Sequence, residues 1–179
     1  MPDDKEGGYK PPVYHPEEAK MITGIQHMSF TVSNLGDTMH FFSDILGLEV
    51  SPIREAKGGR VEKILQIDGA SLRICNVITP DNGNIEFIEY VAPEGRKNDP
   101  MTCNIGVAHV GFTVDDLQKV YEDLAAKGVK FNHPPVWTYE GPMKGWGVCY
   151  AKGPDGITLE FMQPPKGVKL HPATGLVAG

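Results

Sequence analysis

The sequence lacks long hydrophobic runs and clusters of basic residues, and each absence argues against a class of partner. No stretch of the 179 residues approaches the roughly 18 to 20 apolar residues that a membrane-spanning helix needs. The net charge is −6 and the Lys and Arg residues do not cluster, whereas binding to nucleic acid phosphates requires concentrated positive charge. We therefore expect neither a membrane nor a nucleic acid as partner.

Paired cysteines are also missing. The three cysteines, Cys75, Cys103 and Cys149, form neither a CxxC pair nor an even-numbered disulfide framework. Residues 1–20 are polar and contain prolines, without the apolar centre of a signal peptide. These features predict a reducing, cytoplasmic location. Hydrophobic residues make up 40% of the chain and charged residues 22%, which is typical of a globular protein with a hydrophobic core.

An internal repeat is the most informative feature that the sequence contains. Segments 24–35 (GIQHMSFTVSNL) and 106–117 (GVAHVGFTVDDL) share Gly, His, Phe, Thr, Val and Leu at matching positions. His27 in the first segment corresponds to His109 in the second, an offset of 82 (109 − 27). In each segment the Phe and Val residues alternate with the His and Thr residues, as on the two faces of a strand. The repeat predicts two similar modules, each opening with a strand whose histidine lies on the polar face.

A helix is expected after each of these strands, and short strands after each helix. Apolar residues at helical spacing predict a helix over 37–46 that Gly47 ends, and a second helix that begins near 117 and ends at Gly128. The strand-like runs that follow are 49–51, 61–67, 71–77 and 85–91 in the first copy, and 129–131, 147–151 and 157–162 in the second.

The order of these elements predicts an α+β fold built from two tandem βαβββ modules. We place the modules at residues 21–99 and 100–165. An N-terminal arm, 1–20, precedes them, and a C-terminal tail, 166–179, without hydrophobic periodicity follows them.

Each module also ends in an apolar strand that carries a carboxylate. Glu89 and Glu160 each lie four residues before a proline. A carboxylate in the middle of a strand is costly to bury unless it is paired or bound to a cation. Together with His27 and His109, the two glutamates supply two imidazole nitrogens and two carboxylates, which suit Zn, Ni, Co, Mn or Fe better than Ca²⁺. We therefore predict that these four residues bind one divalent metal ion per site.

Glu86 competes with Glu89 for the role of metal ligand. Strand alternation places Glu86 on the opposite face, and no proline follows it at four residues, so Glu89 is preferred. The remaining histidines have no counterpart in the repeat, and core or surface roles are expected for them; they are His15, His40, His133 and His171.

With these motifs, residues 22–165 resemble the vicinal oxygen chelate superfamily, which includes glyoxalase I, methylmalonyl-CoA epimerase, extradiol dioxygenases and antibiotic-resistance proteins. The resemblance implies that the curved mixed sheets of the two modules enclose a metal-containing cleft. The four-ligand pattern is similar to that of glyoxalase I and the epimerase, whereas dioxygenases of this fold use two His and one Glu. The matching segments are 25–32, 41–48, 108–117 and 153–161.

The resemblance implies a metal-dependent isomerase, epimerase or lyase of glyoxalase type. A small substrate with vicinal oxygens would chelate the metal, and a carboxylate would move a proton to form an enediolate. The candidate bases are Glu160 and Glu62; Glu62 lies 35 residues (62 − 27) beyond His27, in a segment similar to the strand that carries the catalytic carboxylate of the epimerase. An extradiol-type Fe(II) dioxygenase and a binding or resistance protein without turnover are the alternatives. We expect a homodimer, with the site either within one chain or shared between two.

Overall fold

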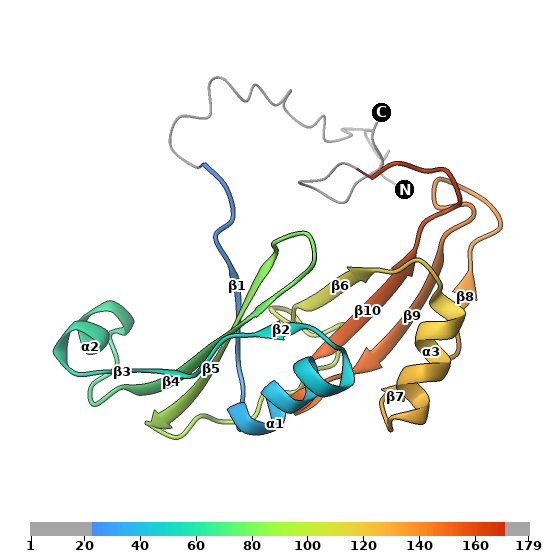
Figure 1. Ribbon diagram of the computed structural model, residues 1–179. Coiled ribbons are helices and arrows are strands. Elements are labelled where there is room, and N and C mark those ends of the chain that lie inside the picture. The colour runs from blue at the N-terminus through green and yellow to red at the C-terminus, as the bar shows by residue number, and fades with distance from the viewer. Residues whose placement is uncertain (1–22, 171–179) are drawn as a thin grey trace, which may run out of the picture.

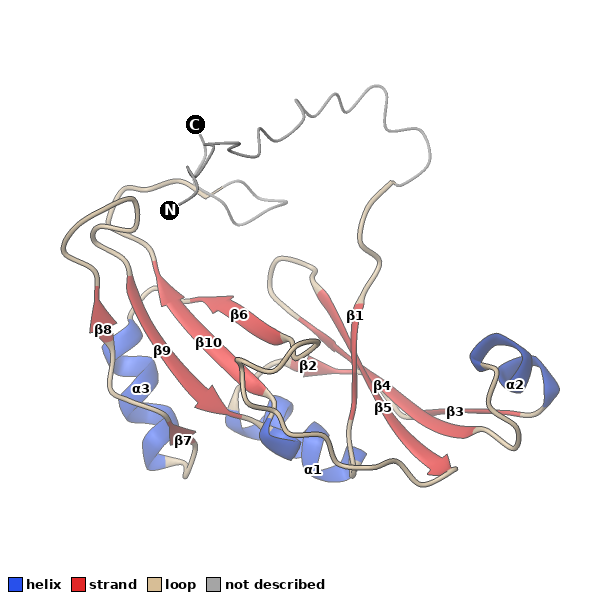
Figure 2. Cartoon of the chain, turned by 180° about the vertical axis from the view of Figure 1, so that it is seen from behind, coloured by secondary structure: helices blue, strands red, loops and turns tan. Residues whose placement is uncertain are grey.

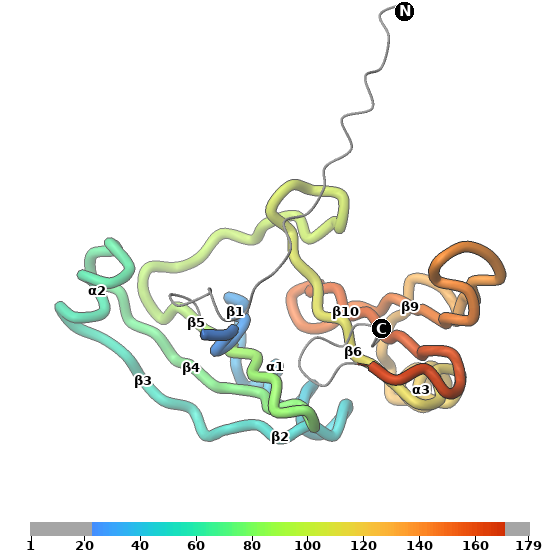
Figure 3. Tube along the Cα trace, turned by 90° about the horizontal axis from the view of Figure 1, so that it is seen from above, coloured from blue at the N-terminus to red at the C-terminus, as the bar shows by residue number. Residues whose placement is uncertain are grey.

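A computed structural model describes residues 23–170. The arm expected at 1–20 lies outside the described residues, as does the segment 171–179 of the expected tail. The two modules lie side by side, each built on one five-stranded sheet (Figures 1 and 3). Within residues 23–170 no helix is long and apolar enough to cross a membrane.

The first module forms a mixed sheet with the strand order β1-β5-β4-β2, and β3 also pairs with β4. Strands β1 and β5 are parallel, and the other pairs are antiparallel. Its elements are β1 (Met28–Thr31), α1 (Leu35–His40), the π-helical turn η1 (Phe41–Ile45), β2 (Glu49–Val50), β3 (Arg54–Lys57), α2 (Gly59–Leu65), β4 (Ser71–Ile78) and β5 (Asn84–Ala92).

The second module repeats this topology. Its strand order is β6-β10-β9-β7, with β8 paired to β9, and β6 and β10 are the parallel pair. The prediction of an α+β fold with two tandem βαβββ modules is therefore confirmed. The elements are β6 (His109–Thr113), α3 (Leu117–Ala126), β7 (Lys130–Phe131), β8 (Val136–Trp137), β9 (Gly147–Lys152), the 3-10 turn η2 (Pro154–Gly156) and β10 (Thr158–Gln163).

The helix expected over 37–46 begins two residues earlier, at Leu35, and continues as the π-helical turn η1, whereas α3 begins at Leu117 as expected. The side chain of Asn34 accepts a hydrogen bond from the Asp37 N–H, and that of Asp116 accepts one from the Lys119 N–H, so both helices have N-caps. Gly47 and Gly128 follow the helical segments with positive φ of 74° and 89°. Glycine adopts this conformation without the steric penalty that a Cβ would bring.

The helices cover one face of each sheet and join the modules through a common core. Helix α1 packs on β4 and β5, and α3 packs on β9 and β10 (Figure 2). One cluster of buried side chains spans both modules, and each large apolar residue in it contributes about 1.5–3 kcal/mol by leaving water. The largest apolar members, Leu35, Phe42, Phe87, Leu117 and Leu159, are fully buried.

Polar contacts add to this connection between the modules. The Asp155 carboxylate in η2 accepts hydrogen bonds from the backbone N–H of Ser33 at 2.7 Å and from its hydroxyl at 2.6 Å. Lys127, at the end of α3, donates to the carbonyl of Ile45 at 2.7 Å, at the end of η1. Both contacts bridge residues far apart in the sequence, so they stabilise one arrangement of the two modules.

The prediction of a strand over 61–67 was wrong. Residues Gly59–Leu65 form helix α2, which lies beyond the outer ends of β3 and β4 (Figure 1). Val61, Ile64 and Leu65 recur at the i, i+3, i+4 spacing of a helical face, which a strand reading overlooks. Strands β3 and β8 were not predicted, because the sequence of β3, REAK, has no apolar alternation and β8 contains only two residues.

Candidate metal centre

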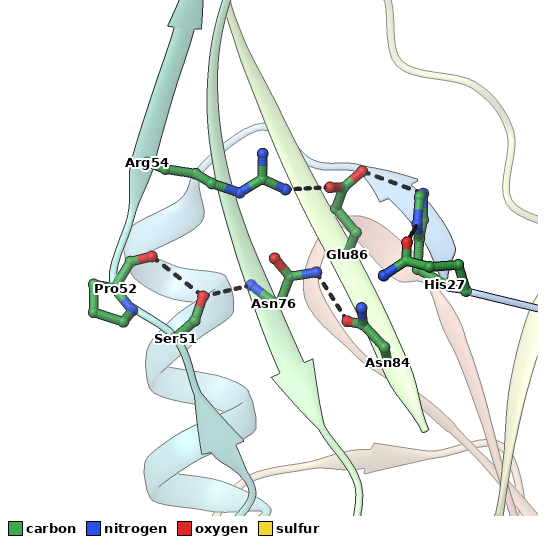
Figure 4. A network of polar contacts seen from close by, with 8 residues as sticks. His27, Ser51, Pro52, Arg54, Asn76, Asn84 and Glu86 are labelled. Carbon is green, nitrogen blue, oxygen red and sulfur yellow. Dashed lines mark hydrogen bonds and ion pairs between the residues drawn. The ribbon is translucent and has the colours of Figure 1, made fainter. Parts of the chain in front are cut away.

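The structure brings His27 to Glu86 in the first module. His27 immediately precedes β1, and Glu86 lies on β5 in register with Ser29 of β1. Nε2 of His27 is 3.6 Å from Oε1 of Glu86 (Figure 4). Nδ1 of the same ring contacts the side-chain carbonyl of Gln26, so Nδ1 donates a hydrogen bond and Nε2 is available to bind a cation. We call His27 and Glu86 the first pair.

His109 and Glu160 form an equivalent second pair. Nε2 of His109 lies 3.1 Å from Oε2 of Glu160, and Glu160 is in register with Gly111 of β6. In the 82-residue repeat Gly111 corresponds to Ser29, which faces Glu86. Glu86 is therefore the structural counterpart of Glu160, at an offset of 74 (160 − 86).

In both pairs the histidine is accessible to a ligand, whereas the glutamate beside it is largely covered. The histidines are 38% and 44% exposed, whereas the paired glutamates are only 12% and 14% exposed. Each carboxylate is thus held in a largely covered position next to an accessible imidazole. This is the polar face predicted for the opening strands, since Phe30 and Phe112 on the other face stack on Phe87 and Phe161.

Glu89 lies on the other face of β5, so the strand-face assignment that favoured it was wrong. Its Oε2 accepts a hydrogen bond at 2.9 Å from the backbone N–H of Leu35, the first residue of α1, and Arg73 donates to the same oxygen at 3.1 Å. In the second module the side chain of Gln163 accepts from the Leu117 N–H at 2.8 Å, at the start of α3. Glu89 corresponds to Gln163 (163 − 89 = 74) and stabilises a helix N-terminus.

Matching the two module ends by their prolines paired Glu160 with the wrong glutamate of the first module. Pro93 and Pro164 are 71 residues apart, three fewer than the offset of 74, because β5 has nine residues and β10 has six. A different signal identifies the counterparts: Ile85-Glu86-Phe87 matches Leu159-Glu160-Phe161, a glutamate between two core residues. Both flanks of Glu86 are buried, with Ile85 2% and Phe87 0% exposed.

The surroundings of the two carboxylates differ. Nη2 of Arg54 lies 2.6 Å from Oε2 of Glu86. Glu160 instead faces Tyr150, its cross-strand neighbour on β9, whose ring also contacts that of His109 at a centroid distance of 5.9 Å. Burial, followed by the nearby Glu160 carboxylate, raises the pKa of the Tyr150 phenol. The phenol therefore stays protonated and can donate a hydrogen bond to the carboxylate.

The chemistry of the four donors fits a divalent cation of intermediate hardness, but one chain does not gather them. Two imidazoles and two carboxylates suit Zn²⁺, Ni²⁺, Co²⁺, Mn²⁺ or Fe²⁺. Among residues 23–170, no three or more His, Cys, Asp or Glu side chains come together as they would around a metal. Each pair thus provides half of a set of two His and two Glu, in which Glu86 takes the place of the predicted Glu89, and within residues 23–170 the two pairs do not form one cluster.

Glu62 lies in α2, and no contact between its side chain and either pair is found in the described part of the chain. We expect the substitution Glu62→Gln to leave turnover within about twofold of the unmodified protein, because its half-buried carboxylate lies in α2, beyond the outer ends of β3 and β4 (Figure 1). Steady-state kinetics with the substrate proposed below measures this. A hundredfold loss with unchanged folding would restore Glu62 as the base.

The other histidines of the described region have local partners, as expected for structural or surface residues. Nδ1 of His40 contacts the Asp44 carboxylate at 2.6 Å, one helical turn away. Nδ1 of His133 donates to the carbonyl of Pro134 at 2.7 Å. His15 and His171 lie outside the described residues.

The fold and the two pairs define the class: paired βαβββ modules with a His and a Glu at matched positions on the polar faces of their sheets. Residues 24–161 match the family model of the Glyoxalase/Bleomycin resistance protein/Dioxygenase superfamily, and the chain belongs to this superfamily. The resemblance drawn from the sequence motifs is thereby confirmed.

Two relatives with assigned activities are enzymes. The chain is 29% identical over 154 residues to a 2-epi-5-epi-valiolone epimerase from Actinomyces sp., and the match covers 84% of each chain. It is 24% identical over 139 residues to the lactoylglutathione lyase GLX1 of Arabidopsis thaliana, and this match covers 76% of the chain but 43% of the relative. An enzymatic function of the superfamily's isomerase or lyase type follows from these matches.

Solved structures share the fold. A glyoxalase family protein from Bacillus cereus superimposes with a TM-score of 0.71 at 20% identity, over 83% of this chain and 98% of the other. A glyoxalase I mutant from Zea mays gives a TM-score of 0.57 at 19% identity, over 80% of this chain and 46% of the other. At these identities the likeness extends to the architecture alone.

Proposed function

We propose that the protein is a metal-dependent epimerase of a small ketone that carries a hydroxyl group next to the carbonyl. The observation that supports this most is the equivalence of the two pairs, each with an accessible imidazole beside a covered carboxylate. The substrate's two adjacent oxygens would be its chelating group.

The metal ligands we propose are His27, Glu86, His109 and Glu160. Glu86 replaces Glu89 in the set predicted from sequence, because it lies beside His27 whereas Glu89 stabilises α1. We further propose that the first pair of one chain meets the second pair of another in a homodimer. A two-fold interface would then create two identical sites, each complete only with both copies.

When bound by these residues, a divalent cation acts as a Lewis acid that makes the C–H beside the substrate carbonyl more acidic. Glu160 accepts that proton: the C–H bond breaks, its electron pair remains on the substrate as an enediolate, and the carboxylate becomes a carboxylic acid. His109 and Tyr150 contact this side chain and hold it in place. A proton from solvent would then be added to the other face of the same carbon, which inverts that centre, and the Glu160 carboxylic acid would release its proton to water.

Two observations favour an epimerase over the other reactions of the superfamily. The relative named as an epimerase is matched along 84% of its length, whereas the lyase relative is matched along 43%. A ring-cleaving dioxygenase needs only two His and one carboxylate, so it leaves the fourth donor of the proposed set without a role. A protein that only binds a small molecule has no need for covered carboxylates beside imidazoles.

Metal removal is expected to abolish proton exchange reversibly. In D₂O, the metal-loaded protein should catalyse incorporation of deuterium next to the ketone of 2-epi-5-epi-valiolone, detected by NMR. Dialysis against a chelator should reduce the exchange rate at least a hundredfold, and Zn²⁺, Ni²⁺, Co²⁺, Mn²⁺ or Fe²⁺ should restore it, since the cation provides most of the acidification.

Parallel assays separate the alternatives. A glutathione hemithioacetal tests lyase activity, and oxygen uptake with a catechol under Fe²⁺ tests dioxygenase activity. Turnover of either without exchange on the hydroxyketone would contradict the epimerase proposal. Exchange that persists at full rate after complete metal removal would contradict the role of the cation.

A further inference from the structure

Among the described residues, an arginine contacts the first pair and no Lys or Arg contacts the second. Arg54, at the start of β3, points across β4 to Glu86, and its Nη2 lies 2.6 Å from Oε2 (Figure 4). The other carboxylate oxygen, Oε1, is the one 3.6 Å from His27. The guanidinium therefore occupies one side of Glu86 and leaves the other oxygen directed at the imidazole.

The sheet register shows that this arrangement is not repeated. Arg54 is paired with Ile74 on β4, and Val136 is paired with Val148 on β9. Ile74 and Val148 are themselves counterparts at the offset of 74 (148 − 74) that relates Glu86 to Glu160. The position of Arg54 is thus taken in the second module by Val136, an aliphatic side chain that is 57% exposed.

The cross-strand neighbours of the two carboxylates differ as well. Asn76 faces Glu86, and Tyr150 faces Glu160. Asn76 donates to the side chain of Asn84 at 2.8 Å, so its amide is engaged in the polar face of the first sheet. Arg54 is consequently the one full positive charge that contacts either carboxylate of the two pairs, among the contacts found in residues 23–170.

The charge of the proposed site depends on this residue. A divalent cation with two neutral imidazoles and two carboxylates is neutral in total, and a neutral centre gives an enediolate anion no net attraction. Arg54 brings the total to +1, which attracts negative charge that develops at the centre. The same positive charge weakens binding of the divalent cation, because the guanidinium and the cation repel each other.

We propose that Arg54 is a positioning and charge-balancing residue: it fixes Glu86 through Oε2 and gives the metal centre the positive charge that stabilises an anionic intermediate. This inference rests on the proposed function. It assigns the first pair to charge stabilisation and leaves proton transfer to Glu160, which contacts no arginine among residues 23–170.

The test separates metal affinity from anion affinity in the full-length protein. For Arg54→Gln we expect the metal-free protein to bind Zn²⁺ roughly tenfold more tightly by calorimetry, because a competing and repelling cation is lost. The zinc-loaded variant should bind acetohydroxamate, an anionic chelator with two adjacent oxygens, roughly tenfold more weakly. Arg54→Lys keeps the charge, so its affinities for Zn²⁺ and for acetohydroxamate should be close to those of the unmodified protein.

Arg73→Gln is the matched control. Arg73 also contacts a carboxylate of β5, that of Glu89, but on the opposite face of the sheet, so neither affinity should change. Circular dichroism melting checks that all variants fold. If Arg54→Gln weakened both affinities in parallel, or changed neither, the proposed role of Arg54 would be wrong. The proposed metal ligands would not be affected by that result. Failure of the unmodified protein to bind any of the divalent ions would overturn the proposed function as well.

Discussion

The substitution Glu86→Gln is expected to weaken divalent-metal binding and turnover at least a hundredfold. An amide oxygen carries no charge, and a ligand set reduced to one carboxylate loses both donor strength and charge neutralisation of the cation. Glu86 lies 3.6 Å from His27, so the loss acts directly on the first pair. Isothermal titration with Zn²⁺ measures the affinity, and the deuterium-exchange assay measures turnover.

Glu89→Gln is the control for that experiment, on the same strand. Its amide oxygen can still accept from the Leu35 N–H, as the amide of Gln163 does from Leu117 in the second module. Only the charge opposite Arg73 is lost, which costs about 1 kcal/mol of unfolding free energy at this partly exposed site. Metal affinity should be unchanged. If Glu89→Gln abolished metal binding and Glu86→Gln did not, the ligand assignment would be reversed.

Mixing two inactive variants is expected to restore activity. His27→Ala removes a ligand of the first pair and His109→Ala one of the second, so each homodimer should have no intact site. A mixed dimer combines the intact first pair of one chain with the intact second pair of the other, and one of its two sites is complete. With random exchange half of the dimers are mixed, so activity should recover to roughly a quarter of that of the unmodified protein.

The mixing experiment requires subunit exchange, which mild denaturant followed by refolding of the mixture ensures. His40→Ala mixed with His27→Ala is the matched control: the His40 ring pairs with Asp44 on its own helical segment and belongs to neither pair, so the His40 variant should be active alone and mixing should give simple averaging. If the His27 and His109 variants stay inactive after verified exchange, the four ligands are assembled within one chain and the shared site is wrong.

Most of the architecture followed from local patterns. The 82-residue repeat located the opening strands, and apolar residues at helical spacing followed by Gly47 and Gly128 located the two helices. These signals are reliable because they depend on neighbouring residues and on backbone geometry. Segment 61–67 was predicted as a strand, whereas Gly59–Leu65 form α2, because a short apolar run fits a strand as well as one helical face.

The two pairs were found only in part from the sequence. The repeat singled out His27, His109 and Glu160, and the structure places His109 beside Glu160. Glu86, the residue that lies beside His27, was passed over because the comparison relied on a proline that lies three residues farther along in the first module. The flanking Ile85 and Phe87 contained the correct signal, since core residues on both sides of a glutamate place it on the opposite, polar face.

The sequence by itself determined the class of fold, the polar face of each opening strand and the residue types that can bind a metal, because these depend on alternation, caps and repetition along the chain. Only the tertiary structure decided which glutamate meets which histidine, because that choice depends on the register between β1 and β5, whose residues are about 57 apart (86 − 29) in the chain. The same register assigned Glu89 to the start of α1 and brought Arg54 to Glu86.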